Sequence, residues 1–294
     1  MNNMMYLIEN AYAKINLSID IVSRMDSGYH NMRMVMQSIA LHDEITVACG
    51  PGEGIHVVTD LRYLPNDERN IASRAAAVFF EYTGFTGYRV DIDVKKNIPV
   101  CAGLGGGSTD GAAVLRALNT LLETKLDRKT LERLAEKVGS DVAFCIAGGT
   151  SLAEGRGEIL TGLEPLPDCR IVICKPAFAI STPELFSRIN CDKIHLRPDT
   201  NGIIEALEKR NLPAVARRMY NVFEDVLPKG SGAVGEIKQR LMEHDALGAV
   251  MTGTGSAVFG LFSSSEDALN AYEDLKSTYQ ECYMTEVIKR IDLE

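Results

Sequence analysis

Apolar and polar residues alternate along a segment near the N-terminus. From Ala11 to Ile21, apolar side chains at every second position are separated by Lys14, Asn16 and Ser18. Successive side chains of a β-strand point to opposite faces of its sheet, so this spacing predicts a half-buried strand. The three polar side chains would then converge on whatever covers that face.

Strands and helices follow one another along the rest of the chain in no regular order. Further strands are expected over residues 38–49, 54–59, 88–94, 170–174, 249–251, 257–262 and 283–288. Helices are expected over residues 70–82, 110–122, 128–138, 141–147, 183–189, 200–209, 214–226, 232–244 and 266–278. Without the β-α-β alternation of a doubly wound sheet, this mixture predicts an α+β fold. A turn-rich stretch at 162–167 predicts a boundary between a domain of residues 1–162 and a domain of residues 163–294.

Composition and charge narrow the classes of function. The 294 residues carry 40 acidic and 31 basic side chains, so a nucleic-acid partner is not expected. No run of about eighteen apolar residues and no signal-peptide pattern occurs, so we expect neither a membrane span nor secretion. The seven cysteines are scattered without a C-x-x-C pair, which argues against a disulfide framework and a structural zinc site. A cytoplasmic location is therefore expected.

A glycine-rich segment carries the strongest chemical signal. Gly103, Gly105, Gly106 and Gly107 precede Ser108, between a predicted strand and a predicted helix. Glycine lets backbone N–H groups approach an anion, and a helix N-terminus adds unpaired donors and the positive end of its dipole. The segment therefore predicts a phosphate-binding loop, which is a stronger interpretation than a tight turn alone. Its spacing matches neither a P-loop nor a dinucleotide fingerprint.

Four segments, in this order, resemble the motifs of the GHMP kinases, named for galactokinase, homoserine kinase, mevalonate kinase and phosphomevalonate kinase. They are Ala-Lys-Ile-Asn-Leu at 13–17, the glycine-rich segment at 99–108, Gly-Ser-Asp-Val-Ala-Phe at 139–144 and Met-Thr-Gly-Thr-Gly-Ser at 251–256. The resemblance spans nearly the whole chain. It implies a ribosomal-protein-like N-terminal domain that binds ATP, a ferredoxin-like C-terminal domain, and an active site in the cleft between them.

The resemblance also implies catalytic and nucleotide-binding residues. Asp141 would be the catalytic base and Lys14 would lie beside it, where a cation keeps the carboxylate ionised and stabilises the transferred phosphoryl charge. The residues expected to bind ATP are Asn70, Pro99, Val100, Cys101, Ala102, Gly103, Leu104, Gly105, Gly106, Gly107, Ser108 and Thr109. Mg²⁺ is expected with ATP, through ligands that the sequence does not indicate. Taken singly, Asp141 could be a helix-start carboxylate, Lys14 a solvated strand lysine and Asn70 a helix cap.

The Gly-Tyr-His segment at 28–30 resembles a motif of those GHMP kinases that phosphorylate a cytidyl-bearing sugar alcohol for isoprenoid synthesis. The residues expected at this substrate are Asn16, Tyr29, His30, Thr182 and Phe186. The likeness implies that Tyr29 and Phe186 sandwich the cytosine ring while His30 hydrogen-bonds its edge. Asn16 would contact the sugar alcohol. For Phe186, a core position on an amphipathic helix remains an alternative.

Two departures from the family pattern concern the glycine-rich segment. Cys101 and Ala102 stand where smaller residues or glycine are more usual, and Thr-Asp-Gly at 109–111 replaces a commoner Ser-Asp-Ala. They leave the glycine core intact.

Alternative functions stay open beside the cytidyl-substrate kinase. These are another GHMP kinase of the homoserine or mevalonate type, and a catalytically silent nucleotide-binding protein on the same scaffold. Lys14 and Asp141 together disfavour the silent protein. The acidic balance disfavours an RNA-binding protein. A monomer or weak homodimer is expected.

Overall fold

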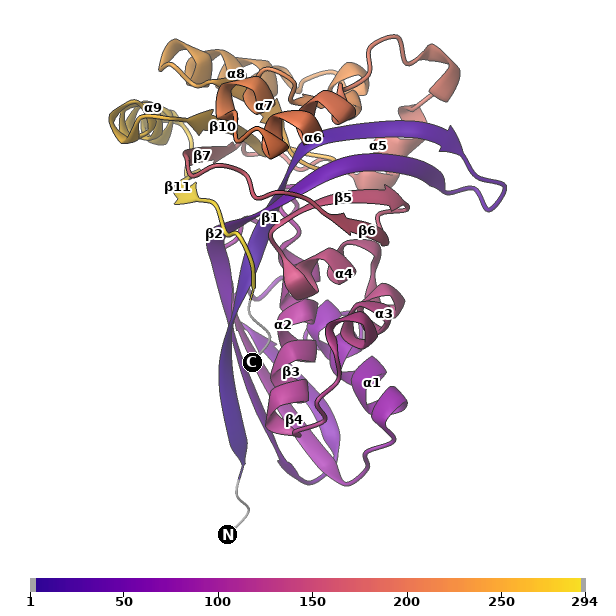
Figure 1. Cartoon of the computed structure of the whole chain (residues 1–294). Helices are drawn as coiled ribbons and strands as arrows, with labels where there is room; N and C mark the ends of the chain where they lie inside the picture. Colours follow the sequence, from indigo (N-terminus) through magenta and orange to yellow (C-terminus); the bar gives the residue numbers. More distant parts are fainter. Residues whose placement is uncertain (1–3, 292–294) are drawn as a thin grey trace.

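Two sheets of unequal size organise the computed structural model, which describes residues 4–291 (Figure 1). A large sheet extends along the N-terminal half, with helices packed against it. A smaller sheet from the C-terminal half lies across one end, with helices of its own. The mixture of helices and strands in this arrangement confirms the predicted α+β class.

The large sheet is built on a long antiparallel hairpin of β1 (Met5–Arg24) and β2 (His30–Pro51). In order across the sheet, the described strands are β3 (Gly54–Thr59), β4 (Tyr88–Lys95), β2, β1 and β8 (Tyr220–Asn221). At its first half, β2 pairs instead with β5 (Thr150–Gly155), which pairs with β6 (Ile159–Gly162). The sequence did not predict β5, β6 or β8. The two halves of β2 therefore serve different neighbours.

Residues 13–19 of strand β1 are buried on both faces, so the prediction of a half-buried strand is wrong for this part of the chain. Its pairing with β2 shifts register between Tyr12 and Lys14 and again between Asn16 and Ser18. Lys14, Asn16 and Ser18 are all buried. The reason is tertiary, because distant segments lie against this part of the strand. The backbone N–H of Lys14 donates to Leu104 O at 3.0 Å, and that of Asn16 donates to Thr252 Oγ1 at 3.1 Å.

Three helices pack against the large sheet: α1 (Ile71–Thr83), α2 (Gly106–Leu121) and α4 (Ser140–Ala147). Helix α3 (Arg128–Val138) packs against these three helices. Helix α2 begins four residues earlier than predicted, inside the glycine-rich segment. The buried Arg116 of α2 donates to Cys145 O of α4 at 2.9 Å and to Asn10 O of β1 at 3.2 Å. One guanidinium therefore ties together the helix that follows the glycine-rich segment, the helix that carries Asp141 and the strand that carries Lys14.

The smaller sheet consists of β11 (Glu281–Glu286), β7 (Arg170–Lys175), β10 (Val258–Phe262) and β9 (Gly248–Met251), in that order. Around it are α5 (Thr182–Arg188), η1 (Cys191–Lys193), α6 (Thr200–Glu208), α7 (Leu212–Ala216), η2 (Val222–Val226), α8 (Gly232–Glu243) and α9 (Ser265–Thr278). The predicted helix over 214–226 is wrong, because α7 ends at Ala216 and the chain then forms β8 and η2. The side-chain amide of Asn221 donates to Met251 O at 2.7 Å and to Gly253 O at 2.8 Å, contacts that override local helix propensity.

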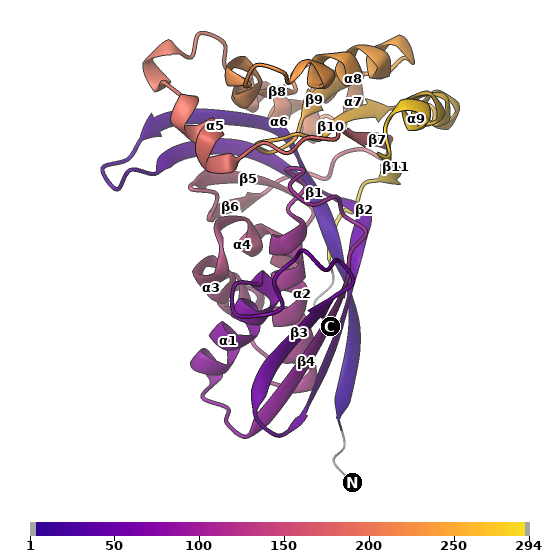
Figure 2. The same ribbon diagram turned by 180° about the vertical axis from the view of Figure 1, so that it is seen from behind.

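The two halves of the chain are joined by more than one segment. Residues 287–291 return from the small sheet to the large one, where Ile288 N donates to Ser38 O at 3.0 Å and Ile291 N donates to Ala147 O at 3.0 Å. Helix α5, β5 and β6 gather around the tip of the β1–β2 hairpin in both views (Figures 1 and 2). The predicted boundary at residue 162 falls where β6 ends and stays a prediction.

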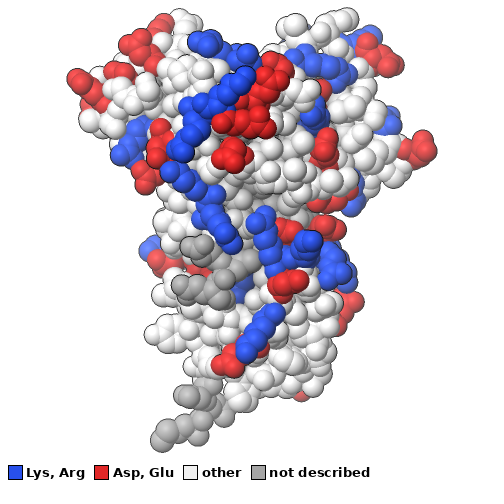
Figure 3. Space-filling model, viewed as in Figure 1, with Lys and Arg blue, Asp and Glu red and all other residues white. Residues whose placement is uncertain are grey.

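Basic and acidic side chains are neighbours on the molecular surface. Figure 3 shows both kinds interspersed over one face. Examples of surface ion pairs are Arg218 with Asp199 at 3.0 Å and Lys289 with Asp168 at 2.9 Å. The expectation that nucleic acid is not a partner stays a prediction. Within residues 4–291, no helix has the length and apolar character that crossing a membrane requires.

Candidate active site

The glycine-rich segment leads directly into helix α2. Gly105 caps the helix with a φ of +73°, and the first intrahelical hydrogen bond runs from Thr109 N to Gly105 O at 2.9 Å. The N–H groups of Gly106, Gly107 and Ser108 therefore lie at the helix N-terminus without a partner inside the helix. These donors and the helix dipole favour an anion.

A cavity of about 480 Å³ runs along this segment. Its lining includes Asn70, Lys96, every residue from Pro99 to Ser108, and Asp110. The residues expected to bind ATP thus border one cavity, except Thr109. The side chain of Thr109 is buried and donates to Tyr12 O at 2.6 Å, which anchors α2 to β1.

Cys101 has an unusual backbone conformation. Its φ is +55°, in the left-handed region that favours glycine, and its side chain is exposed. A non-glycine residue in this region costs about 1–2 kcal/mol. The departure from the family pattern at this position therefore adds local strain.

A second cavity, of about 850 Å³, collects the predicted catalytic and substrate residues. Its lining includes Lys14, Asn16, Tyr29, His30, Asp141, Thr182 and Phe186. It shares Cys101, Gly103, Gly105 and Thr182 with the first cavity, so the two lie side by side along the glycine-rich segment. Residues from both halves of the chain thus meet where a phosphoryl group could pass between two ligands.

Lys14 and Asp141 lie together at the second cavity. Lys14 Nζ is 3.5 Å from Asp141 Oδ2 and donates to Asn16 Oδ1 at 2.8 Å. The Lys14 side chain is 4% exposed, whereas that of Asp141 is 35% exposed. The buried ammonium is therefore paired, as a buried charge must be. The carboxylate sits in the first turn of α4, which favours negative charge, and it remains open to the cavity.

The turn that follows β9 lies against the glycine-rich segment. Thr252 Oγ1 is 3.2 Å from Gly103 O and accepts from Asn16 N at 3.1 Å. A Cβ on Gly103 would stand 2.1 Å from Thr252 O, and one on Gly253 would stand 2.8 Å from Gly103 Cα. The two backbones therefore touch because both glycines lack side chains. Residues 253–255 of this turn line the second cavity.

Aromatic residues also line the second cavity, and we call the part of it at Tyr29, His30, Phe186 and Phe223 its aromatic end. The rings of His30 and Phe186 are 5.1 Å apart at an angle of 31°, and Phe186 meets Phe223 edge to face. Phe186 is only half-buried, while its neighbour Leu185 is the buried residue of α5. Burial and, to a lesser extent, the charge of Arg24 lower the pKa of His30, which favours a neutral imidazole. Phe186 and His30 thus present ring faces and edges to the cavity.

Asn70 is the N-cap of α1. Its Oδ1 accepts from Ala72 N at 2.9 Å and its Nδ2 donates to Pro65 O at 2.8 Å. Both polar groups therefore have partners within the protein, and the Oδ1 contact is the helix cap that the alternative interpretation expected. Asn70 also borders the first cavity, and its contact with ATP stays a prediction.

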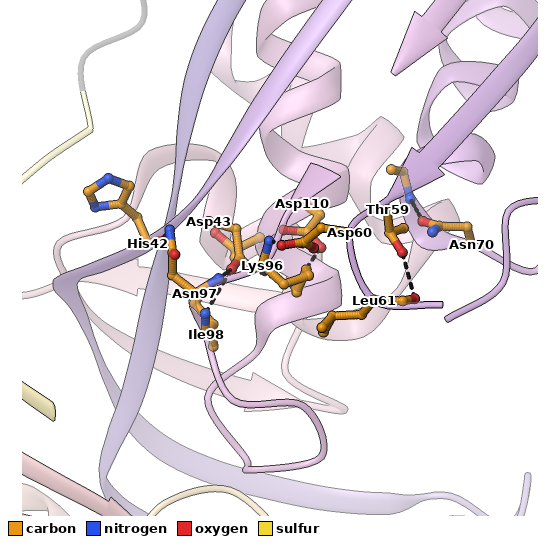
Figure 4. A network of polar contacts seen from close by, with 12 residues as sticks. His42, Asp43, Thr59, Asp60, Leu61, Asn70, Lys96, Asn97, Ile98 and Asp110 are labelled. Atoms are coloured by element: carbon orange, nitrogen blue, oxygen red, sulfur yellow. Dashed lines mark hydrogen bonds and ion pairs between the residues drawn. The ribbon is translucent and has the colours of Figure 1, made fainter. Parts of the chain in front are cut away.

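A buried charge network under the first turn of α2 was not predicted (Figure 4). Lys96 Nζ lies 2.5 Å from Asp43 Oδ2 and 2.8 Å from Asp110 Oδ2, and all three side chains are buried. Asp43 Oδ1 accepts the backbone N–H groups of Asn97 and Ile98. Asp43 lies within β2 and Lys96 directly follows β4, far away in sequence, so no local motif signals them. The sequence predicted Asp110 as the first residue of a helix and gave it no partner.

The network holds one ammonium between two carboxylates. Asp110 Oδ1 is buried without a hydrogen-bond partner. Burial raises the pKa of Asp110 to about 8, against the opposing attraction of Lys96. Burial acts to lower the pKa of Lys96, but Asp110 and Asp43 outweigh it and the pKa is raised. The network therefore favours a charged lysine and a proton on Asp110 near neutral pH.

The chain matches two family models, described as "GHMP kinases N terminal domain" over residues 70–149 and "GHMP kinases C terminal" over residues 203–281. It is similar to the 4-diphosphocytidyl-2-C-methyl-D-erythritol kinase of Acetivibrio thermocellus, with 42% identity over 95% of this chain and 98% of that relative. It is likewise similar to the enzyme of the same name from Clostridium botulinum, with 39% identity over 96% and 100% of the two chains.

Solved structures give the same picture at the level of the fold. A crystal structure of 4-(cytidine 5'-diphospho)-2C-methyl-D-erythritol kinase matches with a TM-score of 0.80 and 30% identity, over 96% of this chain and 99% of that one. Homoserine kinase from Cytophaga hutchinsonii matches with a TM-score of 0.75 but only 19% identity, over 99% and 96%. The second likeness concerns the fold alone. The first extends over the sequence that carries both cavities.

We expect Gly103→Ala to cost more stability than Gly84→Ala. Both glycines have a positive φ, +77° and +70°, so both substitutions carry the left-handed penalty of roughly 1 kcal/mol. Only Gly103 faces another backbone, since nothing lies within 4 Å of a Cβ on Gly84. Gly103→Ala should therefore lose about 3 kcal/mol or more in urea unfolding. Equal losses of stability in the two variants would contradict a stabilising backbone contact at Gly103.

We expect Asp110→Asn to change how stability depends on pH. In the wild type, the pKa of Asp110 rises from 3.8 in the unfolded chain to about 8 in the folded protein. The folded state thus keeps a proton that the unfolded state has lost, so the free energy of unfolding falls as pH rises through this window. The variant lacks this titration. Its stability relative to wild type should increase by up to about 1.4 kcal/mol per pH unit until about pH 8. Urea unfolding over a pH series measures this, and a difference independent of pH would refute it.

Proposed function

The chain belongs to the GHMP kinase family, and we propose that it transfers the γ-phosphoryl group of ATP to the C2 hydroxyl of 4-diphosphocytidyl-2-C-methyl-D-erythritol. The observation that carries this proposal is a single cavity lined both by aromatic residues and by the Lys14–Asp141 pair. Such a cavity suits a ligand with a base at one end and a hydroxyl at the other. The adjacent cavity along the glycine-rich segment suits ATP.

In this proposal the substrate is held at both ends. Tyr29 and Phe186 stack on the cytosine, and the neutral His30 offers one donor and one acceptor to its edge. Asn16 can donate to the sugar alcohol through its Nδ2, whose contact within the protein is the weakly accepting sulfur of Met34 at 3.7 Å. Its Oδ1 is already occupied by Lys14. The cytosine and the reacting hydroxyl would thus be positioned by different residues.

Asp141 accepts the proton of the substrate hydroxyl as the oxygen attacks the γ-phosphorus. The new oxygen–phosphorus bond forms while the bond to the β-phosphate oxygen breaks, and ADP leaves. Lys14 stabilises the negative charge that develops, from a position fixed by Asn16. The N–H groups at the start of α2 hold the phosphates of ATP.

Mg²⁺ is part of the proposal as the ion that accompanies ATP. Within residues 4–291, no group of three or more His, Cys, Asp or Glu side chains could hold a metal alone. Mg²⁺ needs only one or two protein oxygens, since phosphates and water complete its shell. The Ser108 hydroxyl and the Asp141 carboxylate border the two cavities and fit this requirement. The ion would neutralise charge on the β- and γ-phosphates.

The assay that tests the function is ADP release with a panel of acceptors. We expect release with 4-diphosphocytidyl-2-C-methyl-D-erythritol and Mg²⁺, and only background release with homoserine, mevalonate or galactose. The reason is that only the first substrate carries the cytosine that the aromatic end would bind. Comparable turnover of homoserine or mevalonate would favour the alternative kinases. ATP binding without turnover of any acceptor would favour the silent protein.

Replacing the proposed base tests the mechanism. Asp141→Asn keeps the side-chain shape but cannot accept the proton, so single-turnover rates should fall by roughly 10²- to 10⁴-fold. Lys14→Met should also slow the reaction, and the double variant should lose far less than the sum of both effects. Binding of both ligands, measured by calorimetry, should persist for Asp141→Asn.

Asp267→Asn is the matched control, because Asp267 also lies in the first turn of a helix, α9, but borders neither cavity. It should leave the rate unchanged. A normal rate for Asp141→Asn would make Asp141 a helix-start carboxylate only, like Asp267.

A further inference from the structure

Arg156 is a cation at the substrate cavity to which the reaction described above gives no role. It lies in the turn between β5 and β6 and lines the same cavity as Tyr29 and Asp141. Its guanidinium carbon is 5.3 Å from the centroid of the Tyr29 ring, over the ring face. The side chain is 45% exposed, so a ligand in the cavity can reach it. No motif in the sequence indicated this residue.

The turn itself fixes where Arg156 stands. Gly155 and Gly157 have φ values of +71° and +113°, which glycine adopts readily. The backbone N–H of Arg156 donates to Glu158 Oε2 at 2.6 Å, which pins the turn. A Cβ on Gly157 would lie 3.7 Å from Asp141 Oδ1, so the turn passes directly beside the proposed base. Arg156 therefore stands between the aromatic end of the cavity and its reaction centre.

The charges around the cavity leave Arg156 available to an anion. Among the described residues that line it, the Lys, Arg, Asp and Glu side chains are Lys14, Asp141 and Arg156. Lys14 is engaged by Asp141 and Asn16. Within residues 4–291, Arg156 approaches one carboxylate closely enough for an ion pair, that of Glu158, and at 3.8 Å this is loose. Burial keeps His30 from adding positive charge, because it lowers the pKa.

The substrate places its own negative charge in the same region. In 4-diphosphocytidyl-2-C-methyl-D-erythritol, the diphosphate joins the cytidine to the sugar alcohol. If the cytosine lies at Tyr29 and the hydroxyl at Asp141, the diphosphate must lie between them. A guanidinium presents a planar set of donors that matches phosphate oxygens in a bidentate contact.

We propose that Arg156 binds the diphosphate of the substrate and so selects a cytidine diphosphate ester over an uncharged nucleoside. This inference rests on the proposed function and extends it by a specificity-determining residue. The Tyr29 ring has two contacts in this arrangement, since one face holds the guanidinium in place while the remaining ring surface meets the base. A purely supporting role, in which Arg156 only orients Tyr29, is the competing explanation.

Two ligands that differ only in phosphate separate these explanations. Calorimetry with cytidine diphosphate and with cytidine should be done on the wild type, Arg156→Ala and Arg156→Lys. We expect Arg156→Ala to lower the affinity for cytidine diphosphate by roughly 10- to 100-fold, because a charge-assisted contact is lost. The affinity for cytidine should be nearly unchanged. Arg156→Lys keeps the positive charge but not the planar set of donors, so it should lose less affinity for cytidine diphosphate than Arg156→Ala. In turnover, KM for the substrate should rise more than kcat falls.

Arg128→Ala serves as the matched control, since Arg128 is an exposed arginine on α3 paired with Glu132 at 2.7 Å. Arg128→Ala should change neither the affinity for cytidine diphosphate nor that for cytidine. Retained cytidine binding shows that Arg156→Ala is folded. An equal loss of both ligands would overturn the proposal in favour of a supporting role for Tyr29, and unchanged cytidine diphosphate binding would overturn it outright. If the wild type binds neither ligand, the proposed function itself fails. This outcome differs from a failure of the Arg156 proposal alone, in which the wild type still binds cytidine diphosphate.

Discussion

The contact between the backbones at Gly103 and Gly253 is the constraint on which the site depends. It joins the loop that leads into α2 to the turn that follows β9, and it is one of the points at which the two halves of the chain meet. A side chain on either glycine would occupy space that the other backbone fills. Thr252 and Asn16 add hydrogen bonds to the same junction. Because the two cavities lie on either side of this junction, their relative placement follows from it.

Two buried lysines organise the electrostatics around that junction in different ways. Lys14 is paired with a carboxylate that stays open to the substrate cavity, which leaves the pair able to act on a ligand. Lys96 is enclosed by Asp43 and Asp110 beneath the first turn of α2, which leaves it a structural support for the loop. The cost of burying an unpaired ammonium explains why each has its carboxylates. The same physical requirement thus yields one reactive pair and one supporting network.

The proposed functions of the two cavities agree with where their polar groups are free. At the start of α2, the N–H groups without helical partners face the nucleotide side. On the substrate side, Asp141 and Arg156 are the charged groups that remain partly exposed, one beside the reaction centre and one beside the aromatic end. Groups with complete hydrogen bonding, such as Asn70 and Thr109, hold the surrounding elements in place. Exposure and unfilled hydrogen bonds therefore separate ligand contacts from supports more clearly than residue type does.

The α+β class, most helices and strands and the glycine-rich segment could be predicted from the sequence, because side-chain periodicity, glycine conformations and helix starts belong to short stretches. The other residues that gather at the two cavities were predicted from the resemblance to the GHMP kinases. Contacts between distant segments account for the burial of residues 13–19 of β1 on both faces and for the interruption of a predicted helix near Asn221. Such contacts also join Lys96 to Asp43 and Asp110 and bring Arg156 over Tyr29. In each of these cases the partner is supplied by a distant segment, and a contact between distant segments leaves no periodic pattern in the sequence.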